Sequence, residues 1–260
     1  MGGVARRATV IREVREQTKH AVLVLDAGST FFGQILAMQS EGRIIVDAMN
    51  AMAYDAMTVG LMDLLKGVDV LLQRAQQAKF AVVSCNIVNI ESEEPILEPY
   101  AIIEREGIRF GIIGVSEPDV IRVPSEGVAS IKVLDPVPTV QRYLPEVRQR
   151  SDLVILLSHL GFAEDKAIAS AVPGIDVIVG GRSRKRMSTP ERVGETIIVQ
   201  MGYDGEDMGK LDVTFAAGHQ ILSLSLDNMY MGPGVADDAE LSALVRAYRQ
   251  KFATPTQPAR

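Results

Sequence analysis

The chain of 260 residues has one cysteine, Cys85, and no long apolar run. A single cysteine excludes an intrachain disulfide and a zinc site built from cysteines. No run of about eighteen or more apolar residues occurs, so we predict no transmembrane helix. The basic start, residues 1–7, is not followed at once by an apolar segment, so the sequence as written shows no signal peptide. Cysteine usage therefore leaves the compartment open.

The chain also lacks an excess of positive charge, because 33 acidic residues outnumber 27 lysines and arginines and give a net charge of −6. This balance argues against a broad surface for binding a nucleic-acid polymer, although a local basic pocket is compatible with it. The chain is 47% hydrophobic. That length and composition suit one large domain or two small ones with an ample core.

Short apolar strands alternate with helical patterns first, and hairpin-like strands follow. This order predicts an α/β fold with mixed sheets. We find no clear boundary before Pro233, so we predict one domain over 1–232, followed by a helix and a disordered Pro-rich tail over 233–260. The predicted helices span 5–18, 44–53, 68–79, 135–150, 164–171 and 238–252. The predicted strands span 21–25, 55–60, 81–84, 100–104, 109–115, 152–158, 176–179, 196–201, 211–215 and 220–227.

Five sequence blocks stand out at the ends of the predicted strands and in the turns after them. They are LVLDAGSTFFG (23–33), MNAMAYDAMTVG (49–60), VVSCNI (82–87), ILLSHLGFAEDKAIASAVPGIDVIVGGRSR (155–184) and IIVQMGYDGEDMGKLDVTF (197–215). In order and spacing, over roughly residues 3–230, they resemble blocks of the 5′-nucleotidase and 2′,3′-cyclic phosphodiesterase family of calcineurin-like metallophosphatases. The resemblance implies a four-layer α/β/β/α sandwich with mixed sheets. It also implies two metal ions that clamp a phosphate and generate a hydroxide.

Most positions that the resemblance assigns to the metal site are altered here. The family's first ligand pair, Asp-x-His on a first strand, would precede this chain, so that strand is expected to be absent from it. Of the ligands inside the chain, one histidine, His159, is retained. The altered positions are Ser29 for the bridging Asp, Leu61 and Met62 for an Asn and the catalytic His, and Arg182 and Arg184 for two His. The acid that follows the catalytic His survives as Asp63.

Leucine and methionine offer no hard ligand, and a guanidinium repels a dication and cannot be deprotonated. We therefore predict a catalytically impaired homologue, a pseudoenzyme without a cofactor that binds a protein partner or a small anionic ligand. One alternative is a phosphoester hydrolase with a rebuilt or single-metal site at His159 with Asp26 or Asp63, which would need a divalent metal in its single-metal form. Another is a decaying reading frame with no selected role.

Each of these residues also has a plainer interpretation. His159 is interpreted as a hydrogen-bonded histidine at a strand end rather than a relic ligand. Ser29 is interpreted as a turn residue, because no Gly-x-Ser-x-Gly motif surrounds it and His159 is the one plausible base. A basic run is either an anion clamp or, as we favour, solvated charges and ion pairs with Asp63 or nearby Glu side chains; its members are Arg182, Arg184, Lys185 and Arg186.

Overall fold

The computed structural model describes residues 3–253, and its largest sheet has six strands. Their order is β10-β11-β9-β8-β6-β5, in which β11, β9, β8 and β6 are parallel neighbours and both edge strands are antiparallel. The strands are β5 (Tyr100–Arg105), β6 (Ile108–Ser116), β8 (Leu153–His159), β9 (Val177–Gly180), β10 (Glu191–Val193) and β11 (Thr196–Gln200).

A second, parallel sheet has the order β1-β2-β3 and carries the N-terminal helices on its outer face. Its strands are β1 (Leu25–Asp26), β2 (Ala56–Thr58) and β3 (Ala81–Val83). The helices of this half are α1 (Val4–Gln17), α2 (Ile35–Gln39), α3 (Arg43–Ala51) and α4 (Val68–Gln77), with a 3-10 helix at Leu61–Leu64.

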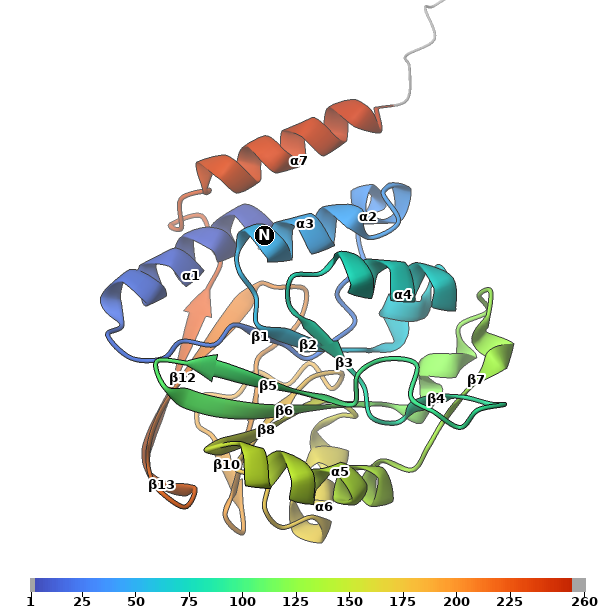
Figure 1. Ribbon diagram of the computed structural model, residues 1–260. Helices are drawn as coiled ribbons and strands as arrows, with labels where there is room; N and C mark the ends of the chain where they lie inside the picture. The colour runs from blue at the N-terminus through green and yellow to red at the C-terminus, as the bar shows by residue number, and fades with distance from the viewer. Residues whose placement is uncertain (1–2, 254–260) are drawn as a thin grey trace, which may run out of the picture.

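The two sheets lie face to face, with helices outside each, in the order helices, sheet, sheet, helices (Figure 1). Helices α5 (Pro136–Arg150) and α6 (Phe162–Ala171) cover the outer face of the six-stranded sheet. Neighbouring residues of β8 alternate between two cores: Ile155 and Leu157 face the other sheet, while Leu156 faces α5 and α6. This alternation follows from the two-residue period of a strand, and it confirms the four-layer α/β/β/α fold.

The remaining elements flank this sandwich. A small sheet pairs β4 (Ile87–Asn89) with β7 (Ile131–Val133), and short 3-10 helices occupy Pro118–Arg122 and Val128–Ser130. A long hairpin joins β12 (Asp207–Ala216) to β13 (Gln220–Tyr230). Helix α7 (Ala239–Lys251) contacts α1 and α3, and buries Leu241 in the core between the small parallel sheet and its helices.

The predicted strand over 21–25 is wrong in extent, because β1 contains Leu25 and Asp26 alone. Asp55 explains part of the difference: its side chain accepts the N–H of Val24, at the place where a ladder bond would lie. The predicted disordered tail lies mostly outside the described residues. Among residues 3–253, no helix is long and apolar enough to cross a membrane.

Candidate functional site

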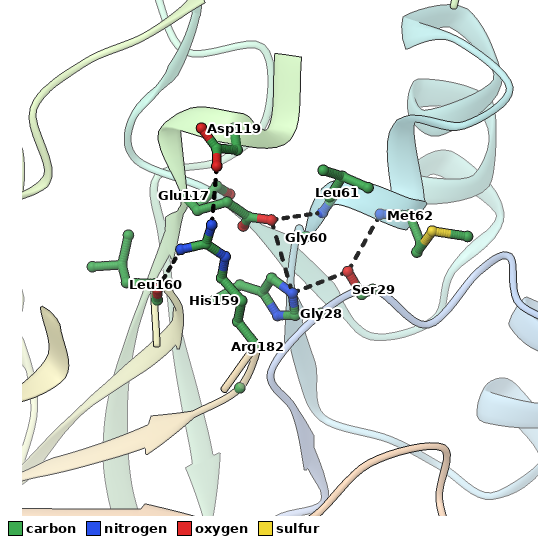
Figure 2. Close-up of polar contacts among 12 residues, drawn as sticks. Gly28, Ser29, Gly60, Leu61, Met62, Glu117, Asp119, His159, Leu160 and Arg182 are labelled. Carbon is green, nitrogen blue, oxygen red and sulfur yellow. Dashed lines mark hydrogen bonds and ion pairs between the residues drawn. The ribbon is translucent and has the colours of Figure 1, made fainter. Parts of the chain in front are cut away.

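The carboxyl ends of four strands from both sheets meet at one place (Figure 2). The turn after β1 carries Ser29, and Gly60 follows β2. From the six-stranded sheet, Glu117 follows β6 and His159 ends β8. Ligands of α/β proteins gather outside the carboxyl ends of strands, so this is where the fold predicts a functional site.

His159 lies at the centre of this cluster and is 6% exposed. Its Nδ1 is 2.5 Å from the carbonyl oxygen of Ala27, and its Nε2 is 3.0 Å from Ser29 Oγ. Because a carbonyl can only accept, Nδ1 carries a proton. In the neutral ring Nε2 is therefore the acceptor, and the Ser29 hydroxyl donates to it.

Ser29 is half-buried and has a left-handed backbone, with φ 62°. Its Oγ accepts the Met62 backbone N–H at 3.3 Å. Gly60 packs against the Ser29–His159 pair so closely that a Cβ on it would lie 2.7 Å from His159 Nε2, and closer still to Ser29 Oγ. The pair is thus enclosed on the Gly60 side by backbone.

Asp63 is fully buried and organises the loop that carries Ser29. Its carboxylate accepts four backbone N–H groups, those of Ser29, Thr30, Phe31 and Gly60, at 2.7–2.9 Å. Burial raises the pKa of Asp63 to about 6, although three of these amides lower it. Asp63 therefore holds two turns together, and its oxygens are directed at backbone.

Glu117 was not anticipated from the sequence. Its side chain is 1% exposed, and Oε1 accepts the Leu61 N–H at 3.1 Å and lies 3.9 Å from His159 Nε2. Oε2 is buried without a hydrogen-bond partner among the described residues. Burial raises the pKa of Glu117, against a lowering by His159. In the sequence, the position of Glu117 directly after the apolar run of β6 could have identified it as a candidate.

Arg182 is fixed by two contacts at the rim of the cluster. One terminal nitrogen donates to the Leu160 carbonyl at 3.0 Å, and the other lies 3.0 Å from Asp119 Oδ2 (Figure 2). Arg182 thus pairs with Asp119, and no ion pair between it and Asp63 is present among residues 3–253.

The rest of the basic run, Arg184, Lys185 and Arg186, is exposed. Arg184 lies 5.2 Å from the centre of the Tyr203 ring, and Lys185 lies 3.3 Å from that of Phe162. Within the described chain neither has a carboxylate partner, whereas Arg186 pairs with Asp207. The structure does not gather these cations around His159 as one clamp.

The side chains around His159 are a poor match to a pair of divalent ions. Leu61 and Met62 supply no hard donor, and Asp63 is occupied by backbone amides. Within residues 3–253, no three His, Cys, Asp or Glu side chains are arranged to hold one metal ion. Divalent ions require several N or O ligands in defined geometry, and His159 with Glu117 does not complete such a set.

Known proteins similar to this chain include nucleotidases. The snake venom 5′-nucleotidase of Crotalus adamanteus is 31% identical over 268 residues, which cover 94% of this chain and 45% of that protein. The enzyme of Naja atra is 30% identical, covering 93% and 50%. The chain thus spans about half the length of the curated relatives it matches. No family model matches the sequence.

Solved structures of related proteins show the same similarity. A 5′-nucleotidase precursor from Thermus thermophilus superposes with a TM-score of 0.86 at 31% identity, covering 96% of this chain and 53% of that one. The sulfate thiohydrolase SoxB of the same genus superposes with a TM-score of 0.89 at 22% identity, covering 97% and 47%, and supports the fold alone. Sequence and structure together show that the chain is a metallophosphatase domain of the kind found in 5′-nucleotidases and calcineurin-like phosphoesterases.

Proposed function

We propose that this chain is a metallophosphatase homologue that no longer hydrolyses phosphoesters with two metal ions and acts by binding an anionic ligand. The observation that carries the proposal is the donor set around His159. Where the family resemblance assigns ligands, the chain has Leu61, Met62 and two arginines. These positions border a polar cluster around His159. Within the described chain, the buried hydrogen-bonding groups of this cluster bond to other protein groups, apart from Glu117 Oε2.

The exposed pair Arg184 and Lys185 supports an anion site at the rim. Both charges lack a carboxylate partner within the described chain, and each lies beside an aromatic ring. The Tyr203 ring is 48% exposed. Because the relatives are named as 5′-nucleotidases, we propose a phosphate-bearing small molecule of the nucleotide class. Guanidinium binds phosphate through two hydrogen bonds, and an exposed ring can stack on a base.

Metal analysis and a turnover assay test the first part of the proposal. Purified protein, loaded with excess manganese and then dialysed, is expected to retain far less than one equivalent of metal. It is also expected to release no phosphate from AMP or p-nitrophenyl phosphate with manganese present. Stoichiometric metal together with sustained turnover would overturn the proposal.

Thermal unfolding with and without AMP tests the second part, because a ligand that binds the folded state raises Tm. The double substitution Arg184→Ala and Lys185→Ala is expected to abolish the rise. Arg192→Ala is the matched control, since Arg192 is an exposed arginine on β10 outside this run, and it should keep the rise. An unchanged Tm for the unsubstituted chain at millimolar AMP would refute the anion site.

A further inference from the structure

We propose that Ser29 and His159 form a nucleophile–base pair that takes up an acyl group from a small, uncharged carboxylic ester without a metal ion. This activity is separate from the anion binding proposed above and does not rest on it. It starts from the hydrogen bond between Ser29 Oγ and His159 Nε2, which the sequence pattern alone did not favour.

The geometry meets the three requirements of an activated serine. The hydroxyl is 3.0 Å from an imidazole nitrogen that can take its proton. A third group, the Ala27 carbonyl, holds the opposite ring nitrogen at 2.5 Å and so fixes the tautomer that leaves Nε2 free to accept. A nucleophile, a base and a group that orients the base are the parts common to hydrolases with catalytic serines.

The backbone holds the serine in place. A left-handed φ at a residue other than glycine is strained and persists where surrounding bonds enforce it. Here the Ser29 N–H donates to Asp63, and the neighbouring Gly28 N–H and Thr30 hydroxyl donate to Asp26. These bonds keep Oγ directed at the imidazole, and the half-buried side chain is partly open to solvent.

Local charge selects an uncharged ester over a phosphate monoester. Two carboxyl groups contact the pair, Glu117 beside His159 and Asp63 beside Ser29, and the nearby guanidinium, that of Arg182, is already paired with Asp119. A phosphate dianion arriving at Ser29 would therefore meet little uncompensated positive charge, and its desolvation would not be offset. A neutral ester avoids this cost.

Few donors are available for the negative charge that develops on the ester oxygen. The N–H groups of Gly28, Ser29, Thr30 and Phe31 already donate to Asp26 or Asp63, and the Met62 N–H donates to Ser29 Oγ itself in the resting site, so it would have to turn from Oγ toward the oxyanion. Loss of one oxyanion donor lowers kcat by about 10²–10³ in a serine protease. We therefore expect slow acylation, which is better detected as a covalent adduct than as turnover.

The reaction balances with water as the one co-reactant. Ser29 Oγ bonds to the carbonyl carbon while its proton passes to Nε2. The tetrahedral intermediate then expels the alcohol, which takes that proton. Water, deprotonated by Nε2, attacks the acyl carbon of the acyl-serine. The bond between that carbon and Oγ then breaks, Nε2 returns its proton to Oγ, and the carboxylic acid leaves. No oxidant or reductant is needed.

The test uses the full chain in EDTA with an uncharged alkyl fluorophosphonate, which a base-activated serine attacks at phosphorus with loss of fluoride. We expect one adduct by intact mass and peptide mapping that places it on Ser29. Ser29→Ala should prevent it, while Ser92→Ala, at an exposed serine in the loop after β4, should not. Prior incubation with p-nitrophenyl butyrate should slow the labelling. No adduct on Ser29 of the wild-type chain would overturn the proposal.

His159→Ala tests the base. General-base catalysis contributes about 10²- to 10⁴-fold, so labelling of Ser29 should slow by at least 100-fold. Added imidazole should restore part of the rate by occupying the vacated space, which a purely structural histidine would not allow. A Ser29 labelling rate that is the same in His159→Ala as in wild type would show that the serine is not activated by this imidazole. If His159→Ala does not fold, the wild-type adduct and its competition by ester decide the question.

Discussion

At the scale of single residues, the polar side chains around His159 have partners within the protein. Arg182 pairs with Asp119, and Glu117 accepts the Leu61 N–H. Glu117 and Asp119 lie just after β6, in a segment where no motif indicated ligands. Apart from Glu117 Oε2, the polar groups of the site are therefore satisfied by protein neighbours, as is usual for buried polar groups.

Asp165 is a buried carboxyl group that makes folding pH-dependent. It is fully buried, Ser158 Oγ donates to its Oδ1, and its Oδ2 has no partner within the described chain. Burial raises the pKa of Asp165 to about 7. Between its usual pKa and 7 the folded chain thus binds a proton that the unfolded chain releases, so stability falls as pH rises through this window.

Asp165→Asn mimics the neutral acid and should remove this dependence. Relative to wild type, the variant should gain stability from pH 5 to pH 8 by on the order of 2–3 kcal/mol, because about two units of the pKa shift fall inside that interval. Urea unfolding at both values measures the difference. If the difference in free energy of unfolding between variant and wild type did not change with pH, the raised pKa of Asp165 would be contradicted.

Residue identities predicted the site only in part. The strand-end positions of Ser29 and His159 follow from the apolar runs before them, because strand ends meet at one edge of a sheet. Their hydrogen bond does not follow, because it joins residues 130 positions apart in the chain. The same limit applies to Asp63, whose role as an acceptor for two separate turns depends on how β1 and β2 are aligned.

At the scale of elements, β6 of one sheet packs tightly against β3 of the other. Gly114 in β6 faces the backbone of Val83 in β3, and a Cβ at residue 114 would overlap the Val83 carbonyl oxygen. A backbone atom cannot move aside as the end of a flexible side chain can. The spacing of the sheets at this point therefore requires glycine.

Gly114→Ala should destabilise the chain by about 3 kcal/mol, because overpacking of a dense interior forces backbone shifts. Gly33→Ala is the control, since Gly33 is exposed, its φ is not positive, and a Cβ added there would meet no atom within 4 Å. Chemical denaturation of both variants measures their free energies of unfolding. Equal stability of the two variants would contradict the close approach.

Long elements with a clear period were predicted well from sequence. The helix expected over 135–150 and the strand over 152–158 match α5 and β8 to within a residue or so. Short elements were missed: helix α2, edge strand β10 and the pair β4 and β7 have three to five residues each. Segments of that length are too short to show a period.

At the scale of the whole molecule, helix α7 closes one of three cores. Leu241 is 3% exposed and joins the core beneath α1 and α3. Arg12 pairs with Asp238 at the N-terminus of α7, and Tyr248 hydrogen-bonds Asp47. The boundary predicted at residue 232 stays a prediction, but these contacts indicate that α7 contributes to the same folding unit.

Leu241→Ala should therefore lower the free energy of unfolding by about 2–4 kcal/mol, the usual cost of removing a buried leucine side chain. Leu222→Ala is the matched control, because Leu222 on β13 is 59% exposed and should change stability by less than about 0.5 kcal/mol. Thermal melts should also show a single transition for both variants. A Leu241→Ala variant as stable as wild type would mean that α7 folds apart from the core.

The shortness of β1 has a consequence for solvent exchange. Within the described chain, no backbone hydrogen bond engages the N–H groups of Ala21, Val22 or Leu23, whereas those of β8 lie inside the six-stranded sheet. In deuterated buffer the amides just before β1 should therefore exchange rapidly, while those of β8 should exchange at rates set by global unfolding. Slowly exchanging amides in β8 and rapidly exchanging amides before β1 would thus lie in two segments that both lead to the His159 imidazole.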